Sequence, residues 1–537
     1  MSSLPPRSRQ RAAIAANAPG SVLGLYPGTD FVVGDGAGTD GVTFRQIRWY
    51  FQHETVALPR PGVATVTLAG GLDAMAELGA WLSRARGAPE PYPPVVWVAA
   101  PHVIGHGRID ADATHLLAAD GTWNVSLVPR LPLNKSYFNE ITAAWFHQRP
   151  VRVRGTLAAD SLLIRTLWPK DFRLPRDARR AEVQQPPTTV EGIRALVRAE
   201  PNGGAASPFS ASLLWSRDGA SYGVPAGRAI VAIIVNGAQG DDDEAHGGHF
   251  ALLTGRTAAD GSIAEWMVNN FYSLDIESEK GIIAAPVPLD NYLADLNSGQ
   301  GYYRPSAMLV AVLAEDRAAT LLQSALNRVY AQFYRHQIVY DHAAMNCAGI
   351  SVDVLRKLGF PVPARGPAAP VRAALGLPWL IAREGSVRKA CAVFDYLTED
   401  QTRLLPAAAF EEIGAGLVAL ACRSMAAETG SLARTFADDV EALFFLRFPQ
   451  FPTPRALGHA PVLTPFEFHE RQPADPADAQ IIPVPPRPFP RELRDEDLLP
   501  PPTPRSERAL RAWGAASIVG LPWALWRIWR GARTVND

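Results

Sequence analysis

The sequence predicts an α+β protein, because strand-like and helix-like runs follow one another and two of the strands form a hairpin. Alternating or continuous β-branched patterns mark four strands, at 228–236, 247–256, 263–272 and 307–313. Apolar residues recur at helical spacing over 316–335 and 347–358. The turn-forming stretch 257–262 joins the second strand to the third, which predicts an antiparallel pair. An antiparallel sheet followed by helices is the α+β arrangement.

Cys347 lies in the first turn of the predicted helix 347–358. Asn346 is a favoured N-cap residue, and Gly359 is the residue type that ends helices in the left-handed conformation. The unpaired N–H groups and the positive dipole end at a helix start favour an anion, so a thiol there tends to ionise and become a nucleophile. The alternative is that Cys347 packs under the helix as a small apolar residue, as most free cysteines do.

The predicted hairpin brings a histidine close to an asparagine. Folding it about its loop centre, near residue 259, places His249 opposite Asn269 or Asn270. Directly opposed residues on antiparallel strands point to the same face with close Cβ atoms. We therefore expect the imidazole within hydrogen-bonding reach of one of the two amides.

Three motifs in this order resemble a circularly permuted papain-like fold. They are Gly-His-Phe-Ala-Leu-Leu at 248–253, a polar residue on the next strand, and Asn-Cys opening a later helix. This is the permuted NlpC/P60 arrangement, which is similar to that of lecithin retinol acyltransferase-like proteins, and the resemblance covers roughly residues 225–360.

The resemblance implies a thiol hydrolase or acyltransferase acting on amide, ester or thioester carbonyls of a peptide or acyl substrate. Cys347 would be the nucleophile and its backbone N–H would contribute to an oxyanion hole. His249 would be the base, and Asn269 or Asn270 would orient it. The expected site needs no cofactor and no metal.

A second hypothesis is a catalytically silent papain-like domain that serves as a binding or adaptor module. A fold does not guarantee an activity. A proline-dense linker at 449–505 and a tail rich in Trp and Arg at 506–537 are features that a tethered module would carry. In the tail, tryptophans with flanking arginines suit a helix lying weakly in a membrane interface, or one docked on protein.

Composition limits the classes of binding partner and the cellular compartment that we expect. The 537 residues carry 52 Lys plus Arg and 53 Asp plus Glu, so a net charge of -1 gives no footprint for nucleic acid. Three widely spaced cysteines argue against zinc ligation and a disulfide scaffold; Cys391 and Cys422 are expected to be buried. The first thirty residues lack the apolar core of a signal peptide. A cytoplasmic location, with peripheral membrane contact through 506–537, is the expectation.

The remaining segments have less specific patterns. Strand-like and helical runs within 41–175 predict an N-terminal α/β or α+β domain, including a β-pair at 151–155 and 161–167. His102, His106 and Asp110 are interpreted as residues of a solvated loop. The predicted units are a leader (1–40), the N-terminal domain (41–175), a linker (176–227), the papain-like domain (228–375), a helical region (376–448), the Pro-rich linker (449–505) and the tail (506–537).

Overall fold

The computed structural model describes nineteen stretches of the chain. They are residues 20–35, 55–63, 65–66, 74–85, 92–99, 103–119, 121–127, 146–147, 149–158, 161–180, 185–199, 209–237, 248–272, 284–296, 306–334, 337–338, 340–341, 345–367 and 370–449. Most of the predicted leader, the Pro-rich linker beyond 449 and the tail 506–537 lie outside the described residues.

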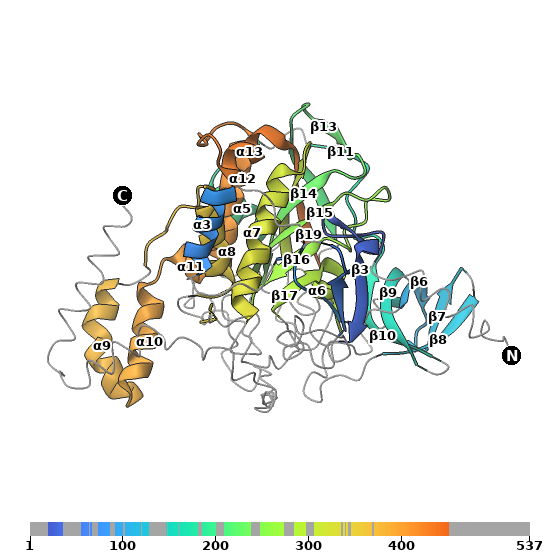
Figure 1. Ribbon diagram of the computed structural model, residues 1–537, viewed down its shortest axis with the longest axis horizontal. Helices are drawn as coiled ribbons and strands as arrows, with labels where there is room; N and C mark the ends of the chain where they lie inside the picture. The colour runs from blue at the N-terminus through green and yellow to red at the C-terminus, as the bar shows by residue number, and fades with distance from the viewer. Residues whose placement is uncertain are drawn as a thin grey trace.

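A seven-stranded sheet, antiparallel at every pairing, forms the centre of the molecule (Figure 1). In spatial order it consists of β12 (Ser210–Ser216), β19 (Val440–Phe448), β18 (Ser306–Leu313), β14 (Ala229–Asn236), β15 (His249–Arg256), β16 (Met267–Asn270) and β17 (Ala285–Pro288). Every residue of β14 and β18 is buried, because the sheet is covered on both faces. This explains why these strands read as continuous apolar runs.

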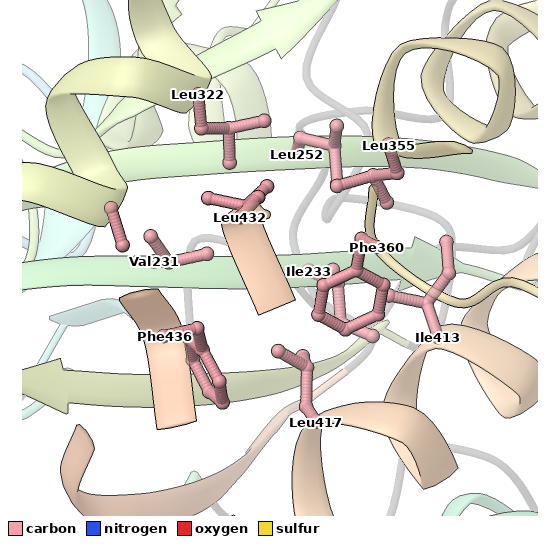
Figure 2. Close-up of a pocket in the computed structure, with 11 residues that line it drawn as sticks. Val231, Ile233, Leu252, Leu322, Leu355, Phe360, Ile413, Leu417, Leu432 and Phe436 are labelled. Atoms are coloured by element: carbon pink, nitrogen blue, oxygen red, sulfur yellow. The ribbon is translucent and has the colours of Figure 1, made fainter. Parts of the chain in front are cut away.

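Helices cover one face of the sheet. They are α7 (Arg317–Tyr334), α8 (Cys347–Lys357), α12 (Pro406–Ala421) and α13 (Leu432–Asp439). Figure 2 shows where this layer meets the sheet: Val231, Ile233 and Leu252 face side chains from all four helices around a void of about 10 Å³. The lining is entirely apolar. This void is a packing gap in the core and contains no group that can perform chemistry.

A closed barrel and a short helix lie on the other face. The barrel consists of β6 (Val103–Ile109), β7 (His115–Ala118), β8 (Gly121–Leu127), β9 (Pro150–Ala158) and β10 (Ser161–Pro169). Trp168 and Phe172 pack on Phe448 of the sheet, with ring centroids 6.3 and 5.7 Å away. The helix is α6 (Leu289–Ala294), which follows β17 directly.

The barrel changes the interpretation of the segment around His106. We expected a loop there because of its glycines, but His106 lies on β6. A Cβ at Gly107 would lie 2.6 Å from the carbonyl oxygen of Leu117 on the neighbouring strand. Glycine is therefore required at this position because the neighbouring strand of the barrel passes so close. Composition alone does not distinguish such a glycine from one in a loop. Asp110 accepts from His115 at 2.7 Å.

Smaller elements complete the fold. A three-stranded sheet contains β3 (Phe31–Asp35), β4 (Thr55–Pro59) and β5 (Val96–Ala99). The other elements are β1 (Val22–Leu23), β2 (Tyr26–Pro27), η1 (Gly28–Asp30), α3 (Ala74–Ala85), β11 (Asp177–Arg179), α5 (Val190–Arg198), β13 (Ser221–Gly223), α9 (Pro370–Glu384), α10 (Val387–Thr398) and α11 (Gln401–Leu404).

Two segments differ from the expected domain organisation. The stretch 176–227, expected to be a linker, contains α5 and supplies β12 to the sheet. The region 376–448, expected to be helical, ends in β19, which pairs with β18 along its full length. An apolar run such as Ala442–Leu446 does not reveal its period, so helix and strand cannot be told apart from the pattern. One continuous hydrophobic core runs from Leu23 to Phe448.

A buried ion-pair network ties the barrel to α6 and to the segment between β15 and β16, and it yields a stability prediction. Arg154 of β9, which is 1% exposed, donates to Glu265 Oε2 at 2.9 Å and to Asp290 Oδ2 at 2.6 Å. Arg152 binds both acids as well, and burial lowers its pKa to about 10. Replacing Arg154 by alanine should lower the free energy of unfolding by about 3–5 kcal/mol, because it leaves buried carboxylates undercompensated.

Urea unfolding followed by circular dichroism measures this loss. Arg149→Ala is the matched control, since its ion pair with Asp171 is solvent-exposed and should contribute less than about 1 kcal/mol. Equal unfolding midpoints for the two variants would show that the buried network does not stabilise the packing of the barrel on α6 and on the segment before β16.

Candidate active site

Cys347 is the first residue of α8, as the sequence predicts. The side chain of Asn346 caps the helix by accepting from the Gly349 N–H at 2.9 Å, and it donates to the Leu404 carbonyl at 2.8 Å. The helix ends before Gly359, whose φ of 76° lies in the left-handed region. Cys347 is 3% exposed. The capping amide is thus held at both ends, which fixes where the helix begins.

His249 and Asn270 are in direct contact. The imidazole Nε2 lies 2.7 Å from Asn270 Oδ1, and both side chains are buried, at 5% and 1% exposed. Because an amide oxygen only accepts, Nε2 carries the proton in this bond. In the neutral imidazole, Nδ1 is then the unprotonated nitrogen, and it is the one able to take a proton.

Strand register explains which asparagine is selected. Asn269 pairs with Leu252, so Asn270 opposes Ala251 and lies diagonally from His249 on the same face of the sheet. The observed pairing of Thr254 with Met267 centres the hairpin between Asp260 and Gly261 and not at residue 259, so the register is shifted from the expected direct opposition. The contact nevertheless forms, because diagonal neighbours lie within reach of long side chains.

Asn269 faces the helical layer instead. Its amide exchanges hydrogen bonds with Gln323 of α7, at 2.9 and 3.0 Å, and donates to the Leu252 carbonyl. Gln323 also accepts from Thr254 at 2.6 Å. Asn269 therefore joins the sheet to α7, and Asn270 is the member of the pair that contacts His249.

A second layer of polar groups supports His249, and sequence reasoning missed it. Asn236, which pairs with His249 across the sheet, donates to Ser306 Oγ at 2.7 Å and accepts from the Tyr292 hydroxyl at 2.5 Å. The Tyr292 ring of α6 lies 6.1 Å from the imidazole. The sequence did contain a signal, because each of three apolar strands carries one polar residue at a terminus. These residues are Asn236, His249 and Ser306.

Contacts of the residues that precede α8 indicate which end of the sheet Cys347 lies near. The ring of Tyr272, two residues past Asn270, lies 5.6 Å from that of Tyr340. Asp341 and Met345 exchange backbone hydrogen bonds, at 2.9 and 3.3 Å, and Cys347 follows two residues later. These contacts bring the start of α8 to the end of the sheet at which β15 begins.

The core packing agrees with this placement. Leu355 of α8 and Leu252 of β15 line the same void (Figure 2). Cys347 precedes Leu355 by about 12 Å along the axis of α8, and His249 precedes Leu252 by about 10 Å along β15. Cys347 and His249 therefore begin two elements that run side by side from the same end of the sheet.

Cys347 belongs to the helical layer on one face of the sheet, whereas the His249 side chain lies on the other face. Alternation along β15 directs Leu252 and Thr254 to the helical layer, and His249 to the face that carries α6.

A larger cavity lies elsewhere. It has a volume of about 960 Å³ and is lined by cations including Arg152, Lys170 and Arg256. Arg256 ends β15, about 23 Å along the strand from His249, so this cavity does not lead to Cys347. Its arginines are largely engaged: Arg152 binds Glu265 and Arg256 binds Asp316.

The structure also bears on the other two cysteines, on metal sites and on membrane-spanning helices. Cys391 and Cys422 are partly buried, and burial raises the pKa of the Cys422 thiol. Within the described stretches, no group of three His, Cys, Asp or Glu residues is arranged to hold a metal ion. Of the helices that the structure describes, none is both long and apolar enough to cross a bilayer.

The different surroundings of the two asparagines predict different mutant phenotypes. Asn270→Ala should slow acylation of Cys347 by about tenfold or more, because the imidazole loses its orienting acceptor, and it should lower stability by about 1–3 kcal/mol, because a buried hydrogen bond is lost. Asn269→Ala should lower stability by a similar amount but leave the acylation rate nearly unchanged, because it removes hydrogen bonds to Gln323 and to the Leu252 carbonyl and none to the imidazole. Single-turnover acylation and urea unfolding, measured on both variants, separate the two roles. The reverse pattern would reassign the orienting residue to Asn269.

Comparison with known proteins adds no relative to this description: no family model, curated protein or solved structure matches the chain.

Proposed function

We propose that the chain is a thiol hydrolase or acyltransferase that uses Cys347 as nucleophile, His249 as base and Asn270 as orienting residue. The observation that carries the proposal is the 2.7 Å contact between His249 Nε2 and Asn270 Oδ1. It holds the imidazole in the tautomer whose Nδ1 is able to accept a proton. The placement of Cys347 at a capped helix start, at the same end of the sheet, supplies the second support.

The proposed reaction has two steps. His249 Nδ1 takes the proton of the Cys347 thiol, and the sulfur attacks an amide, ester or thioester carbonyl carbon. The oxyanion that forms accepts from the Cys347 backbone N–H. The tetrahedral species then collapses, the bond to the leaving group breaks, and the imidazolium protonates that group. Water or another acceptor next attacks the thioester, gives its proton to the imidazole and releases the cysteine.

Trapping the thioester intermediate tests the proposal. The protein is mixed with p-nitrophenyl acetate, an acyl thioester and an acylated peptide amide, quenched in acid and digested. Mass spectrometry should find one acyl group on the peptide that contains Cys347, and none on the peptides of Cys391 and Cys422. Acylation spread equally over the three cysteines, or absent from Cys347, would overturn the proposal.

One observation favours the silent adaptor as a second candidate. Cys347 and His249 are both almost fully buried, at 3% and 5% exposed, whereas a catalytic thiol must be reached by substrate. An adaptor would keep Cys347 unreactive toward small alkylating agents in the native state and reactive only after unfolding. Alkylation of the native protein, compared with alkylation in urea, discriminates between the two functions.

A further inference from the structure

Exposed large hydrophobic side chains gather on one helical hairpin. Of the seven such residues in the described part of the chain, five belong to α9 and α10. The exposed fractions are 64% for Val371, 70% for Leu375, 60% for Trp379, 46% for Val387 and 36% for Val393. Figure 1 shows this hairpin projecting from the side of the molecule opposite the barrel. Apolar side chains concentrated on one exposed element mark an interaction surface.

The stripe has a helical repeat and is separate from the packing of the hairpin. Val371, Leu375 and Trp379 follow one another at intervals of four, which places them along one face of α9. The other face of α9 packs on α10 in a small cluster of its own, formed by Ala373, Ala374, Leu377, Ala390 and Phe394. The exposed stripe is therefore not needed to hold the two helices together.

The charge of the hairpin complements an anionic surface. Residues 370–398 contain four basic residues, Arg372, Arg383, Arg388 and Lys389, and two acidic ones, Glu384 and Asp395, so the net charge is 4 − 2 = +2. Arg388 and Lys389 are exposed and directly follow the turn between the helices. Tryptophan beside aliphatic residues, with cations nearby, is the composition that lies in a membrane interface.

We propose that the α9–α10 hairpin docks on an anionic lipid surface, with the stripe Val371, Leu375 and Trp379 entering the interface and Arg388 and Lys389 facing the headgroups. This inference is independent of the proposed catalytic activity. One amphipathic element binds membranes weakly, and stable attachment takes two signals. The hairpin provides a signal separate from the membrane contact that is one of the two expectations for residues 506–537.

Flotation of the full-length protein with lipid vesicles tests the docking. One set of vesicles is phosphatidylcholine alone, and the other contains one third phosphatidylglycerol. The double variant Leu375→Ser/Trp379→Ser should partition into both sets about tenfold less than the unaltered protein, since two interfacial side chains are lost. Leu117→Ser removes an exposed leucine of β7, 51% exposed, and is the matched control that should float unchanged.

A charge variant separates the electrostatic contribution. Arg388→Ala/Lys389→Ala should reduce flotation by about fivefold or more on phosphatidylglycerol vesicles and leave it unchanged on phosphatidylcholine, since only the anionic surface attracts the two cations. Circular dichroism confirms that each variant keeps its helix content. Equal flotation of the double variant and the unaltered protein would overturn the proposal. So would size-exclusion chromatography that shows a dimer which the double variant dissociates, because the stripe would then join two copies of the chain.

Discussion

Replacing Cys347 by alanine is expected to abolish acyl transfer, with a rate loss of at least about a thousandfold. The members of a nucleophile–base unit act together, so removal of the nucleophile eliminates most of the rate that the unit supplies. Release of p-nitrophenol from p-nitrophenyl acetate under single-turnover conditions measures the loss. Cys347→Ala should fold normally, because the substitution removes one sulfur from a buried position and leaves the Asn346 cap intact.

The other two cysteines are the controls for this result. Cys391→Ala and Cys422→Ala should keep the full rate, since neither residue opens a capped helix and burial raises the pKa of the Cys422 thiol. Retention of activity in Cys347→Ala would refute the assignment of the nucleophile. Loss of activity in Cys422→Ala as well would point to a folding defect.

Replacing His249 by alanine is expected to have the second largest effect, a loss of about a hundredfold or more at neutral pH. General base catalysis contributes roughly 10²–10⁴-fold, and an unassisted thiol is mostly protonated at pH 7. The residual rate of His249→Ala should rise steadily with pH, because each increase converts more thiol into thiolate without help. The unaltered protein should instead change its rate only a few-fold between pH 6 and pH 8, because His249 already holds the proton of the thiol.

A double variant checks that the two residues form one unit. His249→Ala/Cys347→Ala should be no slower than Cys347→Ala alone, because the base has nothing to activate once the sulfur is gone. The Tyr292→Phe variant is the matched control on the same face. It keeps the aromatic ring beside the imidazole and removes the hydroxyl that binds Asn236, so it should change the rate far less than His249→Ala.

The local elements of the site could be predicted from the sequence because each has a strong local signal. Asn346 and Gly359 bracket α8 as a cap and a left-handed terminator should, and the structure confirms both ends. The hairpin of β15 and β16 was predicted from alternation and a turn-rich loop, and its antiparallel pairing is confirmed. The contact between His249 and an asparagine follows from those two features alone.

The long-range features could not be predicted in the same way. Choosing Asn270 over Asn269 requires the register, which depends on how the loop 257–262 is bonded and not on its composition. The barrel joins strands that are tens of residues apart, and β19 pairs with β18 across more than a hundred residues, and no local pattern encodes such partners. The face on which His249 lies depends on the same register, since a shift of one residue reverses it.

The most direct measurement of the central claim is the rate at which iodoacetamide alkylates Cys347 in the folded protein between pH 6 and pH 8. A thiolate–imidazolium pair predicts a rate that changes only a few-fold over this range and that depends on His249. An ordinary thiol with a pKa near 8.5 would react about 75-fold more slowly at pH 6 than at pH 8, because only the thiolate is a nucleophile. That steep dependence, the same rate in His249→Ala, or no alkylation before unfolding would contradict the assignment of Cys347 and His249 as a catalytic pair.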